Sequence, residues 1–279
     1  MRVISHNIDY QSRADVIRIV PLGDIHLGHA LCDEGLLTEW VQQIADDPLC
    51  YWGGMGDICE FINRSDWRAE ESQRAKWLWG ESDLVKAQVE KVRRIFEPIT
   101  DKCLWLVRGN HEDSILKKYE RDAHYEVCRA LGACADRPLD LGYRGFVRLR
   151  CRRMKAGSGE QSTWTLVLYV HHGYGGGRLE GAKALKLGRL PKVYQADVYL
   201  YGHSHARMAQ VQQVLRPARR ADRLEAVNVW EAMTGSFLQS YDANGQLEVY
   251  SEAQDFPPQM VGPIEILVQP DKHEIRVRM

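Results

Sequence analysis

Five short polar blocks in this 279-residue chain carry side chains that can bind divalent metal ions. Carboxylate and amide oxygens and imidazole nitrogens are the ligands that hard and borderline divalent ions prefer in proteins. Together the blocks supply enough of these ligands for two ions. Each block follows directly on an apolar run, and the five are Gly23-Asp24-Ile25-His26, Gly56-Asp57, Gly109-Asn110-His111-Glu112, His171-His172-Gly173 and Gly202-His203-Ser204-His205.

Each block taken alone has an ordinary structural explanation. Aspartate after glycine at a strand end is often a turn former or a helix cap, so Asp24 or Asp57 by itself is weak evidence. Cys59, close to Asp57, is interpreted as a buried thiol, with a role as metal ligand left open. Five blocks that each follow a predicted strand nevertheless favour a metal site over coincidence. Histidines without a partner pattern are interpreted as surface or structural residues: His6, His29, His124 and His273.

Buried strands must position these side chains. The apolar runs 16–22 and 167–170 predict buried strands, so the polar residue after each lies where a strand ends. In open α/β folds, sites form at that edge of the sheet. Asp24 and His26 are two residues apart, so on an extended strand end they would point to the same side, and His203 and His205 repeat the spacing.

Helical periodicity alternates with the strands and predicts a layered α/β core that becomes richer in β-structure after residue 139. Ser82 is the predicted cap of the second helix. The segment 63–80, with Trp67, Trp77 and Trp79, has no clear period and is predicted to be an insertion near the mouth of the site. The predicted helices are 33–44, 82–96 and a basic one at 179–190; the predicted strands are 16–22, 50–52, 103–107, 143–151, 163–170 and 198–201, with β-hairpins beyond Met208 that end at 275–278.

No linker divides the chain, so residues 1–279 are predicted to form one domain, with a motif-bearing core at about 16–208 and C-terminal hairpins at 209–279. Lys plus Arg (37) nearly balance Asp plus Glu (38), so a nucleic acid would have to be held locally. No window approaches the roughly 18 apolar residues that span a bilayer, and a cytoplasmic protein is expected. The seven isolated cysteines are interpreted as reduced thiols.

In their order and spacing, the five blocks resemble the motifs DxH, GD, GNH(E/D), H and GHxH of the calcineurin-like metallophosphoesterases. The resemblance covers roughly residues 16–208, and the glycine-rich stretch 171–177 is most similar to bacterial and phage-type members. It implies an α/β fold, a four-layer α/β/β/α sandwich of two mixed sheets flanked by helices, with a two-metal site at the strand ends. The chain lacks the DRG that follows GD in the protein phosphatase branch, which disfavours a phosphoprotein substrate.

The resemblance also implies two divalent ions, with manganese as the first expectation and iron and zinc as alternatives. His172 is preferred to His171 as a ligand because the family's ligand directly precedes glycine, and His171 remains the alternative. The implied ligands are Asp24, His26 and His205 for one ion and Asn110, His172 and His203 for the other, with Asp57 shared.

Two ions about 3.5 to 4 Å apart can bind phosphoryl oxygens and acidify a water between them, so a metal-bound hydroxide is the expected nucleophile. Only Asp24 and Asp57 among the implied ligands are negative, so the site keeps a positive charge that favours phosphate esters. His111 is predicted to protonate the leaving oxygen, with Glu112 or Asp113 orienting its ring. An imidazole that merely fills space is the alternative.

Arg108 is a second catalytic candidate, because a guanidinium can hold a phosphate oxygen, although arginines at strand ends are often only solvated. The predicted function is therefore a metal-dependent phosphoesterase. Phosphodiesters, either nucleotide or nucleic acid, are favoured because glycines at 175–177 precede a basic stretch, for which a solvated helix face is the ordinary explanation. The alternatives are a phosphomonoesterase, a single-zinc hydrolase and a non-catalytic metal-binding scaffold. The basic stretch comprises Arg178, Lys183, Lys186, Arg189 and Lys192.

Overall fold

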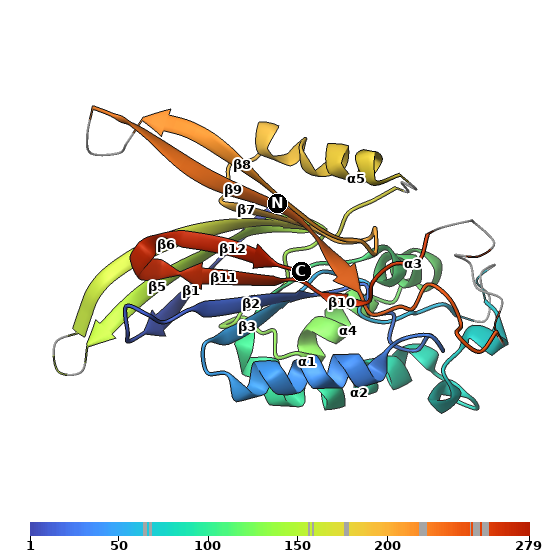
Figure 1. The fold of residues 1–279 in the computed structure, drawn as a ribbon. Coiled ribbons are helices and arrows are strands. Elements are labelled where there is room, and N and C mark those ends of the chain that lie inside the picture. The colour runs from blue at the N-terminus through green and yellow to red at the C-terminus, as the bar shows by residue number, and fades with distance from the viewer. Residues whose placement is uncertain are drawn as a thin grey trace.

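The chain folds into two mixed β-sheets packed face to face, with helices on both outer faces (Figure 1). This computed structural model describes residues 1–63, 66, 69–155, 157, 159–175, 179–217, 222–245, 247, 252 and 257–279. The four layers confirm the α/β sandwich that the motifs implied. Trp67, Gly176, Gly177 and Arg178, which the sequence analysis singled out, lie outside the described residues.

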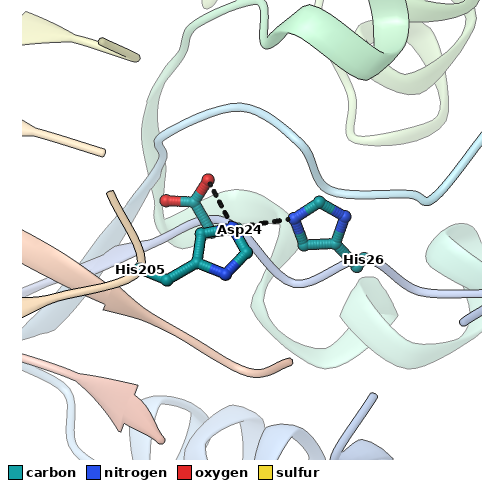
Figure 2. A group of neighbouring side chains, drawn as sticks. All are labelled: Asp24, His26 and His205. Atoms are coloured by element: carbon teal, nitrogen blue, oxygen red, sulfur yellow. Dashed lines mark hydrogen bonds and ion pairs between the residues drawn. The ribbon is translucent and has the colours of Figure 1, made fainter. Parts of the chain in front are cut away.

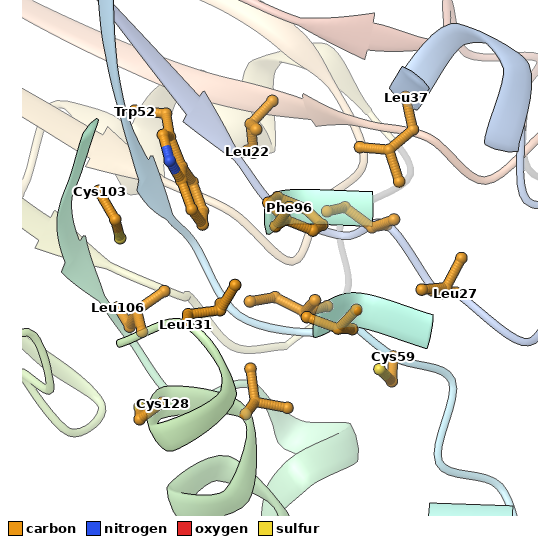
Figure 3. Close-up of a cluster of buried hydrophobic side chains, with 14 of the residues drawn as sticks. Leu22, Leu27, Leu37, Trp52, Cys59, Phe96, Cys103, Leu106, Cys128 and Leu131 are labelled. Carbon is orange, nitrogen blue, oxygen red and sulfur yellow. The ribbon is translucent and has the colours of Figure 1, made fainter. Parts of the chain in front are cut away.

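The first sheet has five strands in the order β12-β11-β2-β3-β4, and three helices cover its outer face. Aromatic and aliphatic side chains from the helices meet the sheet there, for example Phe96 against Trp52 with 4.9 Å between ring centroids (Figure 3). Burying one such side chain contributes roughly 1.5–3 kcal/mol. The elements are β2 (Ile17–Leu22), β3 (Cys50–Gly54), β4 (Cys103–Leu106), β11 (Glu265–Gln269), β12 (Glu274–Arg278), α1 (Glu34–Asp46), α2 (Leu84–Phe96) and α4 (Ala123–Ala130).

The second sheet has seven strands. Six of them follow the order β1-β5-β6-β7-β9-β10, and the seventh, β8, pairs with β9 outside this order. Its inner face packs on the first sheet, and Leu168 of the second sheet shares one hydrophobic core with Ile19 of the first. On its outer face, α5 (Glu180–Leu187) contributes Leu187 to a small cluster with Tyr201 and Met233. The strands are β1 (Arg2–Tyr10), β5 (Arg144–Lys155), β6 (Gly159–His171), β7 (Val198–Tyr201), β8 (Arg207–Pro217), β9 (Leu224–Ser236) and β10 (Gly262–Pro263).

Helix starts follow carboxylate caps. Asp33 accepts the Leu36 N–H at 2.9 Å before α1, and Asp83 accepts the Lys86 N–H at 2.9 Å before α2. The prediction that Ser82 caps the second helix is therefore wrong, because the neighbouring carboxylate takes that role. The predicted basic helix at 179–190 is also shorter, since α5 ends at Leu187 and a 3₁₀ turn follows at Leu190–Lys192.

Three elements have no counterpart among the predictions: β1, α4 and α3 (Asn110–Tyr119). In β1, polar residues interrupt the apolar ones, yet Ile4, Ile8 and Tyr10 alternate into the core between the sheets. The remaining short turns are 3₁₀ helices at Glu71–Gln73, Lys76–Leu78, Glu97–Lys102 and Pro270–Lys272. None of the helices in the described part of the chain is long and apolar enough to span a bilayer.

The C-terminal residues belong to both sheets. β9 pairs in parallel with β7, and β11 lies between β12 and β2. The single-domain organisation stays a prediction, but these strands are integral to the sandwich rather than peripheral to it. Of the tryptophan-rich segment 63–80, Trp77 donates to Glu34 Oε1 at 2.6 Å and packs against the core under α1, whereas Trp79 is exposed.

Candidate metal centre

Five strands end at one edge of the sandwich, and the loops that follow them carry the polar blocks. β2, β3 and β4 of the first sheet and β6 and β7 of the second end within those blocks or one to three residues before them. Asn110 and His111 form the first turn of α3. Residues from five separate stretches of the chain therefore meet at this edge.

The first group of side chains consists of Asp24, His26 and His205, whose ligand atoms all lie within 4.8 Å of one another (Figure 2). The Nε2 atoms of the two imidazoles are 3.2 Å apart, and His205 Nε2 lies 3.8 Å from Asp24 Oδ1. Asp24 is completely buried. The three side chains that the motifs assigned to one ion are thus in position to share it.

The second group consists of Asp57, His172 and His203, again with ligand atoms within 4.8 Å. Asn110 completes it, because its Oδ1 lies 2.8 Å from His203 Nδ1 and 3.0 Å from His172 Nε2. His172 Nε2 is also 3.4 Å from Asp57 Oδ2. The structure brings His172 to this group.

Asp57 is attached to both groups, though in different ways. Its side chain lies with the second group, while its backbone carbonyl accepts the N–H of Ile25 at 2.9 Å and of His26 at 3.0 Å. Its Oδ1 accepts the His111 N–H at 2.9 Å. These bonds tie the β3 loop to the β2 loop and to α3, and the bridging of two ions by the Asp57 carboxylate stays a prediction.

Five of the proposed ligands have left-handed backbones, which is uncommon outside glycine and costs of order 1–3 kcal/mol per residue. The sequence analysis expected Asp24 and His26 on an extended strand end, and this is wrong, because β2 ends at Leu22 and the chain curls beyond it. The φ angles are 47° for Asp24, 54° for His26, 48° for Asp57, 62° for His203 and 52° for His205.

Glycines let the loops approach one another at this edge. A Cβ on Gly109 would lie 2.1 Å from Asp57 Oδ1 and 2.3 Å from the Asp57 backbone nitrogen. Gly56 has a φ of 89°, and a Cβ there would lie 2.7 Å from both the Gly109 nitrogen and His172 Nδ1. The glycine of each motif is therefore required by contact with a ligand loop from elsewhere in the chain.

Hydrogen bonds set which ring nitrogen of two ligand histidines faces the site. His172 Nδ1 lies 2.8 Å from the Met55 carbonyl, so its N–H donates there and Nε2 is left for an ion. His26 Nδ1 lies 2.7 Å from Glu60 Oε2 and leaves its Nε2 facing His205. Both rings therefore present Nε2 to the site. Although burial opposes it, nearby carboxylates raise the pKa of His26 to about 9 and that of His172 to about 10, so an ion would displace the Nε2 proton of each ring.

Glu60 is the functional residue that the sequence analysis missed. Its carboxylate pairs with His26, and it forms a third metal-capable group with His26 and His111. Although burial opposes it, His111 and His26 lower the pKa of Glu60 to about 2, so the carboxylate is charged at neutral pH. Glu60 follows the GD motif by three residues, but no local pattern indicates that it orients a histidine.

The donor set fits divalent cations. Asp24 Oδ1 is buried and has no hydrogen-bond partner among the described residues. Asn110 Oδ1 lies within 3.0 Å of two ring nitrogens, His203 Nδ1 and His172 Nε2. Although burial opposes it, Asp57 and Asp24 raise the pKa of His172 to about 10, so a divalent cation would take the place of the His172 Nε2 proton between these atoms.

The charges of the groups support the same conclusion. Burial raises the pKa of Asp24, whereas His172 and the other nearby imidazoles hold the pKa of Asp57 well below its usual range in spite of burial. Burial lowers the pKa of His203 to about 4 and holds that of His205 well below its usual range, so these two rings are neutral ligands at neutral pH. A buried anion beside neutral imidazoles is an environment that binds cations.

His111 lies at the rim of the first group. Its Nδ1 is 2.5 Å from the Glu60 carbonyl, and its ring meets that of His26 edge-on with centroids 4.7 Å apart. The expectation that Glu112 or Asp113 orients the ring is wrong. The Glu112 carboxylate accepts backbone N–H groups of residues 57, 58 and 109, and the Asp113 carboxylate accepts the Tyr143 hydroxyl at 2.6 Å.

Arg108 is already paired in this structure. Its Nη2 donates to both carboxylate oxygens of Asp122, at 2.9 and 2.8 Å, and its guanidinium lies 5.9 Å from the centroid of the Tyr143 ring. A phosphate would have to compete with Asp122 for this group. The role of Arg108 in binding phosphate stays a prediction.

Other candidates lie apart from the two groups. His171 packs edge-on against Tyr201, with 5.4 Å between ring centroids, and Cys59 is buried in the core under the first sheet. In the basic stretch, Lys183 pairs with Glu180 at 3.1 Å, and the Lys186 ammonium donates to the Tyr174 carbonyl at 3.2 Å. Of these two lysines, Lys186 therefore contacts the glycine-rich loop, whereas Lys183 is paired within α5.

Comparison with known proteins places these motifs in a family. Residues 17–207, more than half of the chain, match the family model described as calcineurin-like phosphoesterase. No curated protein matches the chain. Similar solved structures include a predicted phosphoesterase from Streptococcus pneumoniae, with 11% identity, 94% of each chain covered and a TM-score of 0.33.

Two further solved structures are similar at comparable levels. One is a metallophosphoesterase from Sphaerobacter thermophilus, with 14% identity, 94% of this chain and 87% of that chain covered, and a TM-score of 0.38. The other is a calcineurin-like phosphoesterase from Bacillus subtilis, with 12% identity, 84% and 88% covered, and a TM-score of 0.34. None of these similarities identifies a substrate.

Proposed function

This chain belongs to the calcineurin-like phosphoesterase family, and from that premise we propose that it hydrolyses phosphodiesters, of a nucleotide or a nucleic acid, by in-line attack of water at phosphorus on a dinuclear metal centre. The observation that carries the proposal is the convergence of seven ligand side chains from five loops into two adjoining groups. One group alone would suit a single ion. Two groups joined through Asp57 suit a pair.

Under this proposal each group holds one ion and Asp57 contributes to both. When bound, two divalent ions supply Lewis-acid polarisation of the phosphoryl group and lower the pKa of a water between them. We propose that both ions are manganese, because the nitrogen and oxygen donors include an amide and two carboxylates. Iron and zinc also suit such ligands. The proposed ligands are Asp24, His26 and His205 in the first group and Asn110, His172 and His203 in the second.

The chain's own residues would hold the substrate and move the proton. Only Asp24 and Asp57 among the ligands are anionic, so the loaded site would carry a net positive charge that attracts a phosphate ester. His111 would act as the doubly protonated imidazolium, in which the Nδ1 hydrogen stays on the Glu60 carbonyl and Nε2 gives its proton to the leaving oxygen. Arg108 would bind a phosphate oxygen if it exchanged Asp122 for the substrate.

The preference for diesters rests on Lys186, whose ammonium donates to the Tyr174 carbonyl in the loop that follows the His172 motif. A cation at that position would suit the part of a nucleotide or nucleic acid beyond the reacting phosphate. A monoester offers no such extension and would leave this group unused. We also propose that the protein is cytoplasmic.

The decisive experiment compares three substrates with one enzyme preparation. Metal-free protein is reloaded with manganese and assayed on p-nitrophenyl phosphate, on bis(p-nitrophenyl) phosphate and on single-stranded DNA. The proposal expects the highest kcat/KM for a diester. A higher kcat/KM for the monoester would instead indicate a phosphomonoesterase, and no turnover of any ester would indicate a metal-binding scaffold.

A further inference from the structure

A further group of metal-capable side chains lies outside the centre described above. His124 Nε2 is 3.0 Å from Asp140 Oδ1 and 3.4 Å from Cys128 Sγ, and the three ligand atoms all lie within 4.8 Å of one another. His124 and Cys128 are four residues apart on α4, which puts them on one face of that helix. Asp140 precedes β5 and forms a β-bridge with Leu106 at the end of β4. The three ligands thus come from α4 and from the segment before β5.

The other two ligand atoms share one ring nitrogen. The Asp140 carboxylate oxygen and the Cys128 sulfur both approach Nε2 of His124, which can carry only one hydrogen. That hydrogen serves the carboxylate oxygen, and the thiol carries a hydrogen of its own. A cation placed among the three atoms would replace these two hydrogens and contact all three ligands together.

The distances suit a tetrahedral ion with mixed ligands. Zinc bonds of about 2.0–2.1 Å to nitrogen, about 2.0–2.2 Å to oxygen and about 2.3 Å to sulfur place nitrogen and oxygen roughly 3.3 Å apart, and nitrogen and sulfur roughly 3.6 Å apart. The observed separations are 3.0 Å and 3.4 Å. A shift of a few tenths of an ångström would therefore admit the ion.

The surroundings leave the ligand atoms available and give access from solvent. His124 and Cys128 are 3% and 2% exposed, whereas the Asp140 side chain is 36% exposed, so a water could complete the coordination from that side. Asp140 Oδ1 also accepts the Gly142 N–H at 2.7 Å. The Arg2 guanidinium is the cation that competes most directly, but it pairs with Oδ2 and not with Oδ1.

We propose that His124, Cys128 and Asp140 bind a borderline divalent ion such as zinc, as a third site separate from the phosphoesterase centre. Nitrogen, sulfur and oxygen donors together favour such an ion over magnesium or calcium. The ion would join α4 to the loop before β5 and so stabilise the fold. Because burial and Asp140 raise the pKa of the Cys128 thiol, binding must displace its proton and should strengthen as pH rises.

Cobalt substitution tests the site without reference to activity. A cobalt–thiolate bond absorbs strongly in the near ultraviolet, and the ligands proposed for the phosphoesterase centre include no thiol. Full-length protein stripped with a chelator and titrated with Co²⁺ should develop this band, and C128S should lose it. Asp57→Asn, which alters only the other centre, should retain the band, and C134S, which removes an exposed cysteine, is the matched control.

Zinc binding gives a second, independent measurement. By equilibrium dialysis, wild-type protein should hold one more zinc per chain than C128S, and Asp140→Asn should weaken that extra site by about tenfold or more. If C128S fails to fold, the wild-type spectrum and D140N still decide the question. Absence of the thiolate band in cobalt-loaded wild type, or its persistence in C128S, would overturn the proposal.

Discussion

The Glu60 carboxylate lies 2.7 Å from His26 Nδ1 and turns the opposite ring nitrogen toward the metal-binding group. A carboxylate behind a ligand histidine fixes the tautomer and increases the basicity of the ligand nitrogen. The same residue uses its backbone carbonyl to hold His111. Glu60 therefore holds a proposed ligand through its carboxylate and the proposed proton donor mainly through its carbonyl, with Oε2 also 3.8 Å from His111 Nδ1. Substitution of its side chain should affect the ligand more than the proton donor.

Replacing Glu60 by Ala should weaken manganese binding by roughly 10–100-fold, because His26 loses the carboxylate that orients it. At saturating manganese, kcat should stay near the wild-type value, since the backbone carbonyl that holds His111 remains. The measurement is kcat as a function of free manganese concentration. The exposed Glu39→Gln is the control, and an equal loss of kcat at all manganese concentrations would contradict the assignment.

His111→Ala should lower kcat by roughly 10²–10⁴-fold with both ions retained, because the leaving oxygen loses its proton donor. A nitrophenolate leaves easily without a proton, whereas a sugar alkoxide does not. The loss should therefore be smaller for a p-nitrophenyl diester than for a dinucleotide. Equal losses on both substrates, or loss of metal, would argue that His111 only supports the structure.

Asp57→Asn should remove one negative charge shared by the two groups while keeping an oxygen that can accept the His111 N–H. We expect metal content to fall from two ions per chain and activity to fall by at least about 10²-fold, as for a ligand that acts on both ions. Elemental analysis and initial rates are the measurements. A variant that keeps much of the activity with one bound zinc would indicate a single-zinc hydrolase.

Arg108→Gln should raise KM several-fold with a smaller change in kcat if the guanidinium binds substrate phosphate. Asp122→Asn separates this from a structural role, because it frees Arg108 while leaving an N-cap oxygen for α4. D122N should therefore keep KM at or below the wild-type value. If both variants leave KM unchanged and lower the melting temperature alike, Arg108 serves only to fix α4.

Asp83→Ala should destabilise the protein by about 0.5–2 kcal/mol through loss of the α2 cap, whereas Ser82→Ala should be nearly neutral. Although burial opposes it, the Lys86 N–H and Arg121 lower the pKa of Asp83 from 3.8. The charged Asp83 carboxylate therefore contributes to the free energy of unfolding above pH 3.8, and this contribution is lost as the pH falls through the lower pKa of Asp83 in the folded state. Urea unfolding of wild type and D83A from pH 6 to 2.5 measures this, and a difference in unfolding free energy that widens on acidification would contradict it.

Much of the architecture was predictable from local patterns. Runs such as 16–22 and 198–201 form buried strands because most of their side chains are apolar and are removed from water there, so the polar residue after each lies at the sheet edge. β1 was not predicted because polar residues interrupt its apolar ones. The alternation of buried and exposed side chains in β1 is recognisable only once the strand is paired with β5. The start of α2 was misplaced because Ser82 and Asp83 are both common caps and only the folded geometry chooses between them.

The sequence by itself determined the chemical identity and order of the candidate ligands and the family to which they belong, because residue type and position after a strand are local properties. Tertiary structure alone decided which ring nitrogens face the site, that His172 and not His171 lies beside Asp57, and that Glu60 orients His26. It also decided that His124, Cys128 and Asp140 meet. These relationships are contacts between distant parts of the chain, whose distances and left-handed turns exist only once the two sheets have packed together.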